Sequence, residues 1–286
     1  MSVDPCRSVL YMPGANERAL EKAKTLPADA LILDLEDAVA PDAKVDARAR
    51  VCAAAAGGDY GHRTVTIRVN GLDTPWHADD VRAAAQAGPA AIVVPKVSSV
   101  DEVHAITDAM AAADAPAHTA LWAMIETPRA VLHAEEIAAA SERLTTLVLG
   151  TNDLAKELYA EQVPGRAPLA TALSLCVLAA RATGRVVLDG VYNDVRDADG
   201  FAAECRHGRA LGFDGKTLIH PSQVAPCNAA YSPSDDDITR AERIVAAFEA
   251  AQREGRGVAT VDGRMIENLH VDEARRTLAL AAALDA

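Results

Sequence analysis

Short apolar runs alternate with amphipathic segments along most of the chain. The runs are nearly continuous, which is typical of parallel strands covered on both faces. The segments between them have the apolar spacing of helices, and one begins with a proline near its first turn, where proline is tolerated. The predicted strands are 8–12, 30–35, 64–70, 90–96, 119–125, 145–150, 186–191 and 215–219. The predicted helices include 16–24, 41–55, 98–112, 128–140 and 195–211.

Eight strands that are each followed by a helix predict an α/β fold, the closed (β/α)8 TIM barrel. A doubly wound open sheet is the alternative. Its dinucleotide-binding form needs a glycine-rich first turn, whereas this turn reads Pro13-Gly14-Ala15-Asn16 and contains no GxGxxG motif. We therefore assign residues 1–230 to a barrel domain that carries the catalytic site.

The pattern changes after residue 230. Ser234 and the three aspartates that follow it resemble a helix start, with a capping hydroxyl and acids near the positive helix end. Residues 260–266 are predicted as a short turn, and 271–284 as an amphipathic helix. Residues 231–286 thus form a predicted helical extension that packs on a neighbouring subunit. Packing on its own barrel is the alternative.

Composition narrows the function classes. The chain has 286 residues, 28 of them basic and 41 acidic, and the net charge of −13 argues against a nucleic-acid partner. No apolar run reaches the roughly 18 residues of a membrane helix, and the N-terminus lacks the pattern of a secretory signal. The five cysteines are widely spaced without a CxxC pair, which indicates reduced thiols. We expect a cytoplasmic protein with no membrane partner.

Candidate chemistry lies at the carboxyl ends of the strands, where barrels of this type carry their active sites. Carboxylates follow the second strand (Asp34, Glu36, Asp37), the fifth (Glu126) and the sixth (Asp153). These strand ends meet at one opening of the barrel, which we call the mouth. Like charges resist joint ionisation unless a cation intervenes, so carboxylates from three strands predict a cation there. Oxygen ligands without a histidine–cysteine cluster favour Mg²⁺ or Mn²⁺ over zinc, and Glu126 and Asp153 are the preferred ligands.

Each of these residues also has a structural interpretation. Asp34 would then be a buried carboxylate held by the backbone or by an arginine, and Glu126 and Asp153 would cap the helices that follow them. Arg68 and Lys96 bring cations to the same mouth, which suits an anionic substrate. Arg68 alone would equally suit a structural ion pair.

Eight short motifs then point to a family. The chain resembles the HpcH/HpaI aldolase/citrate lyase family, and specifically its citrate lyase beta-subunit-like branch of acyl-CoA lyases. The motifs occur in family order over nearly the whole chain: RSVLYMPG (7–14), LDLEDAV (33–39), IRVN (67–70), VPK (94–96), IETP (125–128), GTNDL (150–154), IHPSQ (219–223) and DGRMIE (262–267).

The resemblance implies a Mg²⁺-dependent lyase that cleaves or forms a carbon–carbon bond in a 3-hydroxyacyl-CoA such as malyl-, citramalyl- or citryl-CoA. The products would be an acyl-CoA and a 2-oxo acid, namely glyoxylate, pyruvate or oxaloacetate. Family members are typically trimers or hexamers, so we expect a homo-oligomer. Glu126 and Asp153 would hold the metal.

The resemblance also implies roles for the other residues of the mouth. Arg68 would stabilise the enolate oxygen or clamp a carboxylate with its rigid fork. Glu36 and Asp37 would contact metal-bound water and orient Arg68. The substrate carboxylate would lie at Gly150, Thr151 and Asn152, near backbone amides at a helix start. Coenzyme A would bind around the first βα turn. Its candidate residues are Arg7, Tyr11, Pro13, Arg18, Lys22 and Lys24; for Arg18, Lys22 and Lys24 a solvated helix face is the alternative.

One position departs from the family pattern. Acyl-CoA lyases of this family often carry a catalytic aspartate in a C-terminal Met-Ile-Asp segment, donated across the subunit interface. This chain reads Met265-Ile266-Glu267. The extra methylene moves the carboxylate by about an ångström, and misplacement on that scale can cost about 100-fold in rate. Glu267 is therefore either an equivalent acid or base, or the mark of a different substrate.

Three alternatives to the CoA-dependent lyase remain open. The chain could be a citrate lyase beta subunit that acts on a citryl thioester of acyl-carrier protein. It could be a metal-dependent aldolase of free pyruvate-type acids, against which the basic residues near the first turn weigh slightly. It could also be a non-catalytic paralogue that binds coenzyme A, although Arg68, Glu126 and Asp153 are all present.

Overall fold

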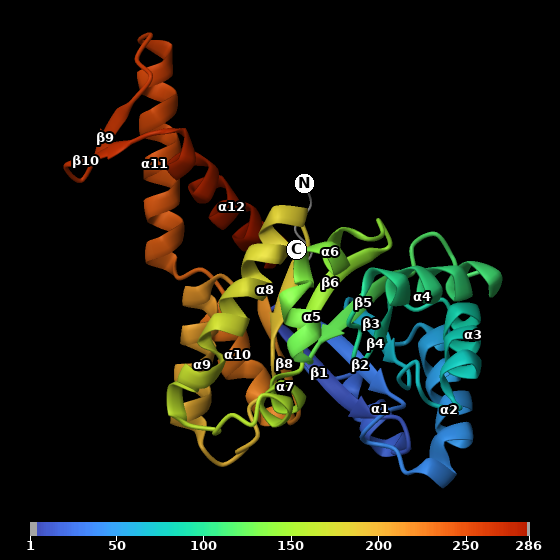
Figure 1. Ribbon diagram of the computed structural model, residues 1–286. Coiled ribbons are helices and arrows are strands. Elements are labelled where there is room, and N and C mark those ends of the chain that lie inside the picture. The colour runs from blue at the N-terminus through green and yellow to red at the C-terminus, as the bar shows by residue number, and fades with distance from the viewer. Residues whose placement is uncertain (1–4, 285–286) are drawn as a thin grey trace. The chain divides into compact units, whose positions relative to one another are not determined.

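The computed structural model describes residues 5–284. Within that range, eight parallel strands close into a barrel in chain order, each paired with its neighbours, and β8 pairs with β1 (Figure 1). This confirms the predicted TIM barrel. The strands are β1 (Ser8–Pro13), β2 (Ala30–Asp34), β3 (Thr64–Arg68), β4 (Ala91–Val94), β5 (Ala120–Ile125), β6 (Leu144–Leu149), β7 (Val186–Asp189) and β8 (Gly215–Leu218).

Helices alternate with the strands and form the outer layer. They are α1 (Glu17–Ala23), α2 (Lys44–Gly57), α3 (His77–Ala87), α4 (Val100–Ala112), α5 (Pro128–Leu132), α6 (Ala134–Ala139), α7 (Thr151–Glu157), α8 (Ala170–Thr183), α9 (Ala198–Leu211) and α10 (Val224–Tyr231). The 3₁₀ turns are η1 (Pro41–Ala43), η2 (Pro164–Leu169) and η3 (Pro221–Gln223). Several helices begin at a residue whose side chain accepts a backbone N–H bond from the first turn: Asn16, Ser99, Thr127 and Asp197.

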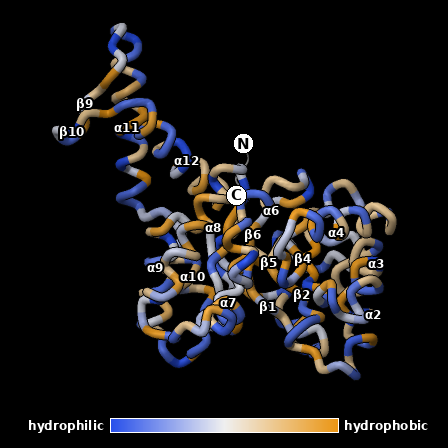
Figure 2. Tube along the Cα trace, viewed as in Figure 1, coloured by the Kyte–Doolittle hydropathy of each residue, from blue (hydrophilic) through white to orange (hydrophobic). Residues whose placement is uncertain are grey.

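The barrel strands carry apolar residues on both faces, as Figure 2 shows by their mostly orange colour. One buried cluster combines residues from most of the strands, among them Ile32, Val93, Trp122 and Leu188. The helices cover the other face, so alternate residues such as Leu31 and Leu33 are also buried. Burial on both faces explains why the strands read as continuous apolar runs.

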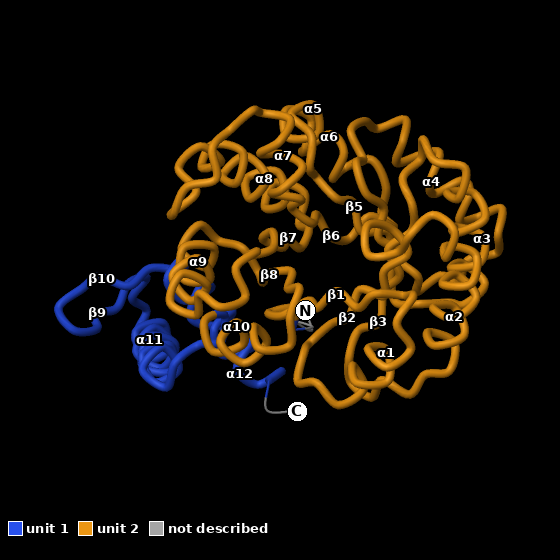
Figure 3. Tube along the Cα trace, turned by 90° about the horizontal axis from the view of Figure 1, so that it is seen from below, with its two compact units in different colours: residues 1–5, 231–286 blue, residues 6–230 orange. Residues whose placement is uncertain are grey.

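The described part of the chain divides into two compact units (Figure 3). The barrel, Cys6–Ala230, is unit 2 in Figure 3. Unit 1 contains Pro5 and residues 231–284, with α11 (Asp235–Arg253), the antiparallel strands β9 (Ala259–Val261) and β10 (Arg264–Ile266), and α12 (Asn268–Leu284). It has a core of its own, which includes Ile244, Phe248 and Ile266. Ser234 caps α11 in a capping box with Asp237, as predicted.

Several predicted elements need correction. The helix predicted over 128–140 is two helices, because His133 leaves the helical conformation with φ −114° and ψ 18°. Residues 260–266 are not only a turn: strands β9 and β10 pair on either side of Asp262 and Gly263. The helix predicted from 195 begins at Ala198, after its cap Asp197. Among residues 5–284, no helix is both long and apolar enough to cross a membrane.

Candidate active site

Arg68 lies at the centre of a group of carboxylates at the carboxyl end of β2 and β3. These strands pair in register so that Asp34 is opposite Arg68. The Asp34 carboxylate accepts hydrogen bonds from Nε at 2.6 Å and from Nη2 at 2.7 Å. Nη1 lies 2.6 Å from Glu36 Oε2 and 3.5 Å from Asp37 Oδ2. The structural interpretation of Asp34, a buried carboxylate held by an arginine, is therefore confirmed.

Tyr11 supports this arginine from inside the barrel. Its ring centroid lies 4.7 Å from the Arg68 guanidinium carbon, a cation–π contact. Burial alone would lower the pKa of Arg68, but Asp34, Tyr11 and Glu36 raise it well above its ordinary value. Burial, together with the charges of Asp37 and Asp34, raises the pKa of Glu36 to about 7 against the charge of Arg68. Arg68 therefore carries a permanent charge among its carboxylates.

Glu126 follows β5 and is buried, with 2% of its surface exposed. Its Oε1 accepts a hydrogen bond from the Lys96 backbone N–H at 2.8 Å. Burial and the charges of Asp153 and Glu36 together raise the pKa of Glu126 to about 7, against the hydrogen bond from Lys96 and the charge of Arg68. Gly150 leaves room for this carboxylate, since a Cβ there would lie 2.1 Å from Glu126 Oε2.

The proposed helix-capping roles of the two candidate ligands are wrong. Thr127, not Glu126, caps α5 by accepting a hydrogen bond from the Ala130 N–H. Asp153 lies in the first turn of α7, whose cap residue is Gly150. With its side chain 34% exposed, Asp153 lies 4.0 Å from the Lys96 ammonium. Both carboxylates are thus left available for another role.

Glu126 and Asp153 fit a hard divalent cation. The Asp153 charge raises the pKa of the buried Glu126, so a cation beside both would relieve an unfavourable interaction. Mg²⁺ commonly uses one or two carboxylates and completes its shell with water and substrate oxygens. The prediction that carboxylates from three strands surround one cation needs correction. In the described chain, no three His, Cys, Asp or Glu side chains are grouped to hold a metal, and Asp34 is bound to Arg68 instead.

The predicted substrate-binding residues lie beside this pair. Thr151 is buried and Asn152 exposed in the first turn of α7. The Asn152 side-chain amide exchanges hydrogen bonds of 3.1 and 2.8 Å with that of Asn193, which joins α7 to the loop after β7. The structure therefore brings Gly150, Thr151 and Asn152 next to Asp153, at the mouth that carries Glu126.

The residues predicted to bind coenzyme A are not brought together. Arg7 precedes β1, at the opposite end of that strand from Pro13, and its guanidinium is bound to Asp29 at 2.7 and 2.9 Å. Tyr11 packs on Arg68 inside the barrel. Lys24 pairs with Glu21 at the end of α1. Two of the predicted cations, Arg18 and Lys22, are exposed on α1.

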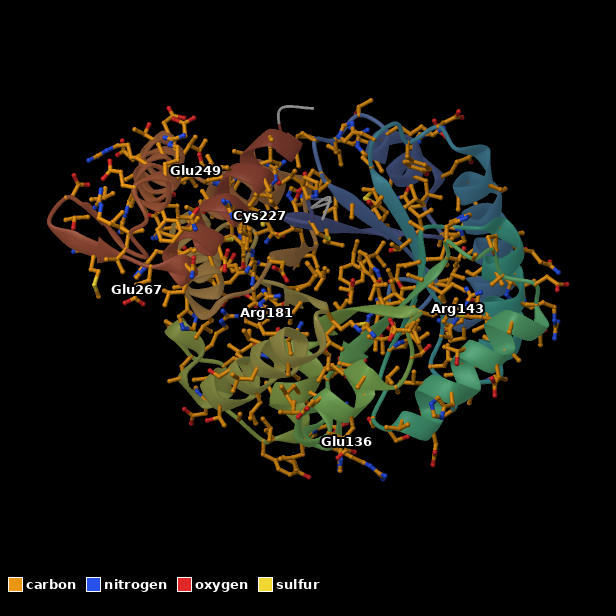
Figure 4. All side chains as sticks on the ribbon, turned by 90° about the horizontal axis from the view of Figure 1, so that it is seen from above. Glu136, Arg143, Arg181, Cys227, Glu249 and Glu267 are labelled. Atoms are coloured by element: carbon orange, nitrogen blue, oxygen red, sulfur yellow. The ribbon has the colours of Figure 1, made fainter. Side chains whose placement is uncertain are left out.

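Glu267 lies in unit 1, between β10 and α12 (Figure 4). Its backbone N–H donates to His270 Nδ1 at 3.1 Å, and its residue surface is partly exposed. Participation of Glu267 in a site with the barrel carboxylates stays a prediction.

The structure contains a second cluster of charged side chains that the sequence motifs do not predict. Asp189 at the end of β7 binds Arg166 Nη1 at 2.6 Å and Lys216 Nζ at 2.9 Å. Lys216 Nζ also binds Glu204 Oε1 at 2.7 Å, and Arg166 Nη2 lies 3.1 Å from His207 Nδ1. We call these residues the outer cluster. A lysine within a strand predicted to be buried on both faces was the available signal, because such a charge needs partners.

The outer cluster borders a cavity of about 450 Å³. Arg166, Glu204 and His207 line one side of it, and Thr151 and Asn152 line another. The cavity therefore adjoins the candidate site through α7, but its lining does not include Glu126 or Asp153.

Comparisons with known proteins identify one family of enzymes. The model of a family described as HpcH/HpaI aldolase/citrate lyase matches residues 7–221. A (3S)-malyl-CoA thioesterase of Cereibacter sphaeroides is 54% identical over 282 residues, which cover 99% of this chain and 96% of the relative. An L-malyl-CoA/beta-methylmalyl-CoA lyase of the same species is 35% identical and covers 94% of this chain and 92% of the relative.

A solved structure agrees over the full length. It is the protein CitE from Mycobacterium tuberculosis in complex with magnesium, acetoacetate and coenzyme A. It superposes with a TM-score of 0.78 and 30% identity, and the match covers 99% of this chain and 100% of that one.

Proposed function

Because the chain belongs to the HpcH/HpaI aldolase/citrate lyase family, we propose that it is a Mg²⁺-dependent carbon–carbon lyase of a 3-hydroxyacyl-CoA. Malyl-CoA is the substrate that the relatives' names favour, with acetyl-CoA and glyoxylate as the products. The observation that carries the proposal is the pair Glu126 and Asp153, which have no helix-capping role and whose charges interact at one mouth.

Glu126 and Asp153 would hold the metal, which acts as a Lewis acid on the 2-oxo acid fragment. Arg68 would stabilise the negative charge that develops on the thioester oxygen when the carbon–carbon bond breaks. Glu36, Asp37 and Asp34 keep its guanidinium fixed, so little reorganisation is needed during the reaction. The expectation that Arg68 clamps a substrate carboxylate is not retained, because Asp34 binds Nε and Nη2 and the carboxylates of Glu36 and Asp37 face Nη1.

Product analysis with the purified protein, Mg²⁺ and (3S)-malyl-CoA tests the proposal. Carbon–carbon cleavage releases glyoxylate and leaves the thioester intact as acetyl-CoA. Citramalyl-, methylmalyl- and citryl-CoA complete the panel, and a citryl thioester of acyl-carrier protein tests the citrate lyase alternative. Cleavage of a free hydroxy-oxo acid, with no turnover of any thioester, would contradict the CoA-lyase proposal.

Thioester hydrolysis is the second candidate function. It is favoured by the 54% identity to a (3S)-malyl-CoA thioesterase, against 35% to the malyl-CoA lyase. Hydrolysis of malyl-CoA consumes one water and yields malate and free coenzyme A. The same assay separates the two reactions, because only hydrolysis produces a free thiol and only cleavage produces glyoxylate.

The proposal also covers the binding of coenzyme A, the subunit interface and the cellular compartment. Arg18 and Lys22, exposed on α1, would face the phosphates of coenzyme A. Residues 231–286 would pack on a neighbouring subunit of a homotrimer or hexamer and bring Glu267 to that subunit's site as an acid or base. The protein would work in the cytoplasm, which is supported by five free cysteines in the described chain.

A further inference from the structure

Lys96 faces both candidate metal ligands from one position. It follows β4, and its backbone N–H donates to Glu126 Oε1 at 2.8 Å. Its ammonium lies 4.0 Å from Asp153 Oδ1. Its φ of 57° is in the left-handed region, which is uncommon and costly for a residue other than glycine. The chain therefore accepts backbone strain where Lys96 meets this carboxylate pair.

The other cations near this mouth already have close partners. Arg68 is surrounded by Asp34, Glu36 and Asp37. The Lys44 ammonium is buried and donates to the backbone carbonyls of Leu35 and Glu36 at 2.9 and 3.0 Å. Arg68 can attract a developing charge from its fixed position, but neither cation can donate to a substrate carboxylate without leaving a carboxylate or carbonyl unpaired, which is costly where these groups are buried.

Lys96 differs in both exposure and distance. Its side chain is 48% exposed, and 4.0 Å to Asp153 Oδ1 is longer than a hydrogen bond. An anionic oxygen that arrives at Glu126 and Asp153 would find this cation within reach.

We propose that Lys96 binds the carboxylate of the 2-oxo acid fragment beside the first turn of α7, where Gly150, Thr151 and Asn152 are predicted to receive it, and that Arg68 does not. This inference rests on the proposed function, because it assigns a residue to that substrate. It predicts that a substitution of Lys96 affects the binding of the acid and the binding of Mg²⁺ differently. Removing the ammonium weakens acid binding, but it does not weaken Mg²⁺ binding, because a positive charge beside two metal-binding carboxylates repels the metal.

The test uses Lys96→Met in the full-length protein. Methionine is unbranched, so it places no more strain on the left-handed backbone than lysine does. Titration calorimetry measures the affinity for Mg²⁺ first, and then the affinity of the Mg²⁺-loaded protein for pyruvate and for pyruvamide, its uncharged analogue. Lys156→Met is the matched control, because Lys156 is exposed on α7 three residues after Asp153.

In Lys96→Met we expect pyruvate affinity to fall about tenfold or more, the usual scale for a charge-assisted hydrogen bond. Pyruvamide affinity should stay within about twofold, and Mg²⁺ affinity should be unchanged or higher. Lys96→Arg should retain part of the pyruvate affinity, and Lys156→Met all of it. Unchanged pyruvate affinity in Lys96→Met would overturn the proposal, as would a parallel loss of Mg²⁺ affinity, which would make Lys96 a structural residue.

The calorimetry also separates this inference from the proposed function. Wild-type protein that binds pyruvate through Lys96 but turns over no CoA thioester would contradict the proposed function alone. Wild-type protein that binds Mg²⁺ but neither pyruvate nor glyoxylate would contradict both.

Discussion

The barrel unit contains two groups of charged side chains that are balanced in different ways. In the outer cluster, Asp189 and Glu204 face Arg166 and Lys216, so the charges cancel. Burial alone would raise the pKa of Asp189, but Lys216 and Arg166 lower it below its ordinary value. These carboxylates need nothing from outside the chain.

The mouth has an excess of negative charge. Among the described residues that interact there, five carboxylates (Asp34, Glu36, Asp37, Glu126, Asp153) face three cations (Arg68, Lys96, Lys44). Burial and neighbouring carboxylates raise the pKa of Glu126 to about 7, against the backbone hydrogen bond from Lys96 and the charge of Arg68. A buried cluster that is balanced within the chain serves structure, whereas one left negative favours a cation from solution.

The largest effect that we predict tests the balance of the outer cluster. Lys216 is fully buried, so Lys216→Met leaves an excess carboxylate beside Arg166. We expect the free energy of unfolding to fall by about 3–5 kcal/mol, measured by urea denaturation. Lys216→Met combined with Glu204→Gln should recover part of the loss. The exposed Arg82→Gln serves as the control, and a Lys216→Met protein as stable as this control would show that the cluster is not a structural unit.

The next largest effect should be a loss of Mg²⁺ affinity when a carboxylate ligand at the mouth is removed. Glu126→Gln keeps the shape of the side chain but removes a charged ligand, so Mg²⁺ affinity should fall about 100-fold or more, given that even indirect ligand partners are worth 10–100-fold. Titration calorimetry measures it, with Glu135→Gln on the exposed face of α6 as the control. If Mg²⁺ binding survives Glu126→Gln, the metal assignment is wrong.

A smaller effect is expected from the glycine beside Glu126. The Cβ added by Gly150→Ala would overlap the Glu126 carboxylate, so the ligand must move. We expect Mg²⁺ affinity to fall about tenfold, since displacement by an ångström costs about that much or more. Gly57→Ala is the matched control, because a Cβ at Gly57 meets no atom within 4 Å. Equal Mg²⁺ affinities in the two variants would mean that Glu126 is not held in a fixed position.

The smallest effect concerns acid stability. The pKa of Asp189 is lowered in the folded protein, so its stabilising contribution is complete above its ordinary value of 3.8 and is lost as the pH falls through the lower folded value. Stability measured from pH 6 to pH 3 should therefore decline more steeply in the wild type than in Asp189→Asn. The difference in slope cannot exceed about 1.4 kcal/mol per pH unit. Identical slopes would show that the cluster does not lower this pKa.

The sequence predicts the mouth better than the outer cluster for a physical reason. Carboxyl ends of parallel strands must meet at one end of a barrel, so residues such as Glu126 and Asp153 can be grouped without coordinates. The partners of Lys216 depend on how β8 aligns with β7 and how α9 packs on them, which no local pattern encodes. For Arg68 the sequence leaves a catalytic role and a structural ion pair both open, and only the structure shows that Asp34, Glu36 and Asp37 together engage Nε, Nη1 and Nη2.

The central claim is that a divalent cation completes the mouth and not the outer cluster. Anomalous diffraction from a crystal of the protein soaked in Mn²⁺ tests both halves in one measurement. The account predicts an anomalous peak beside Glu126 and Asp153, and none beside Asp189 and Glu204. A peak at the outer cluster, or a mouth without one at saturating Mn²⁺, would contradict it.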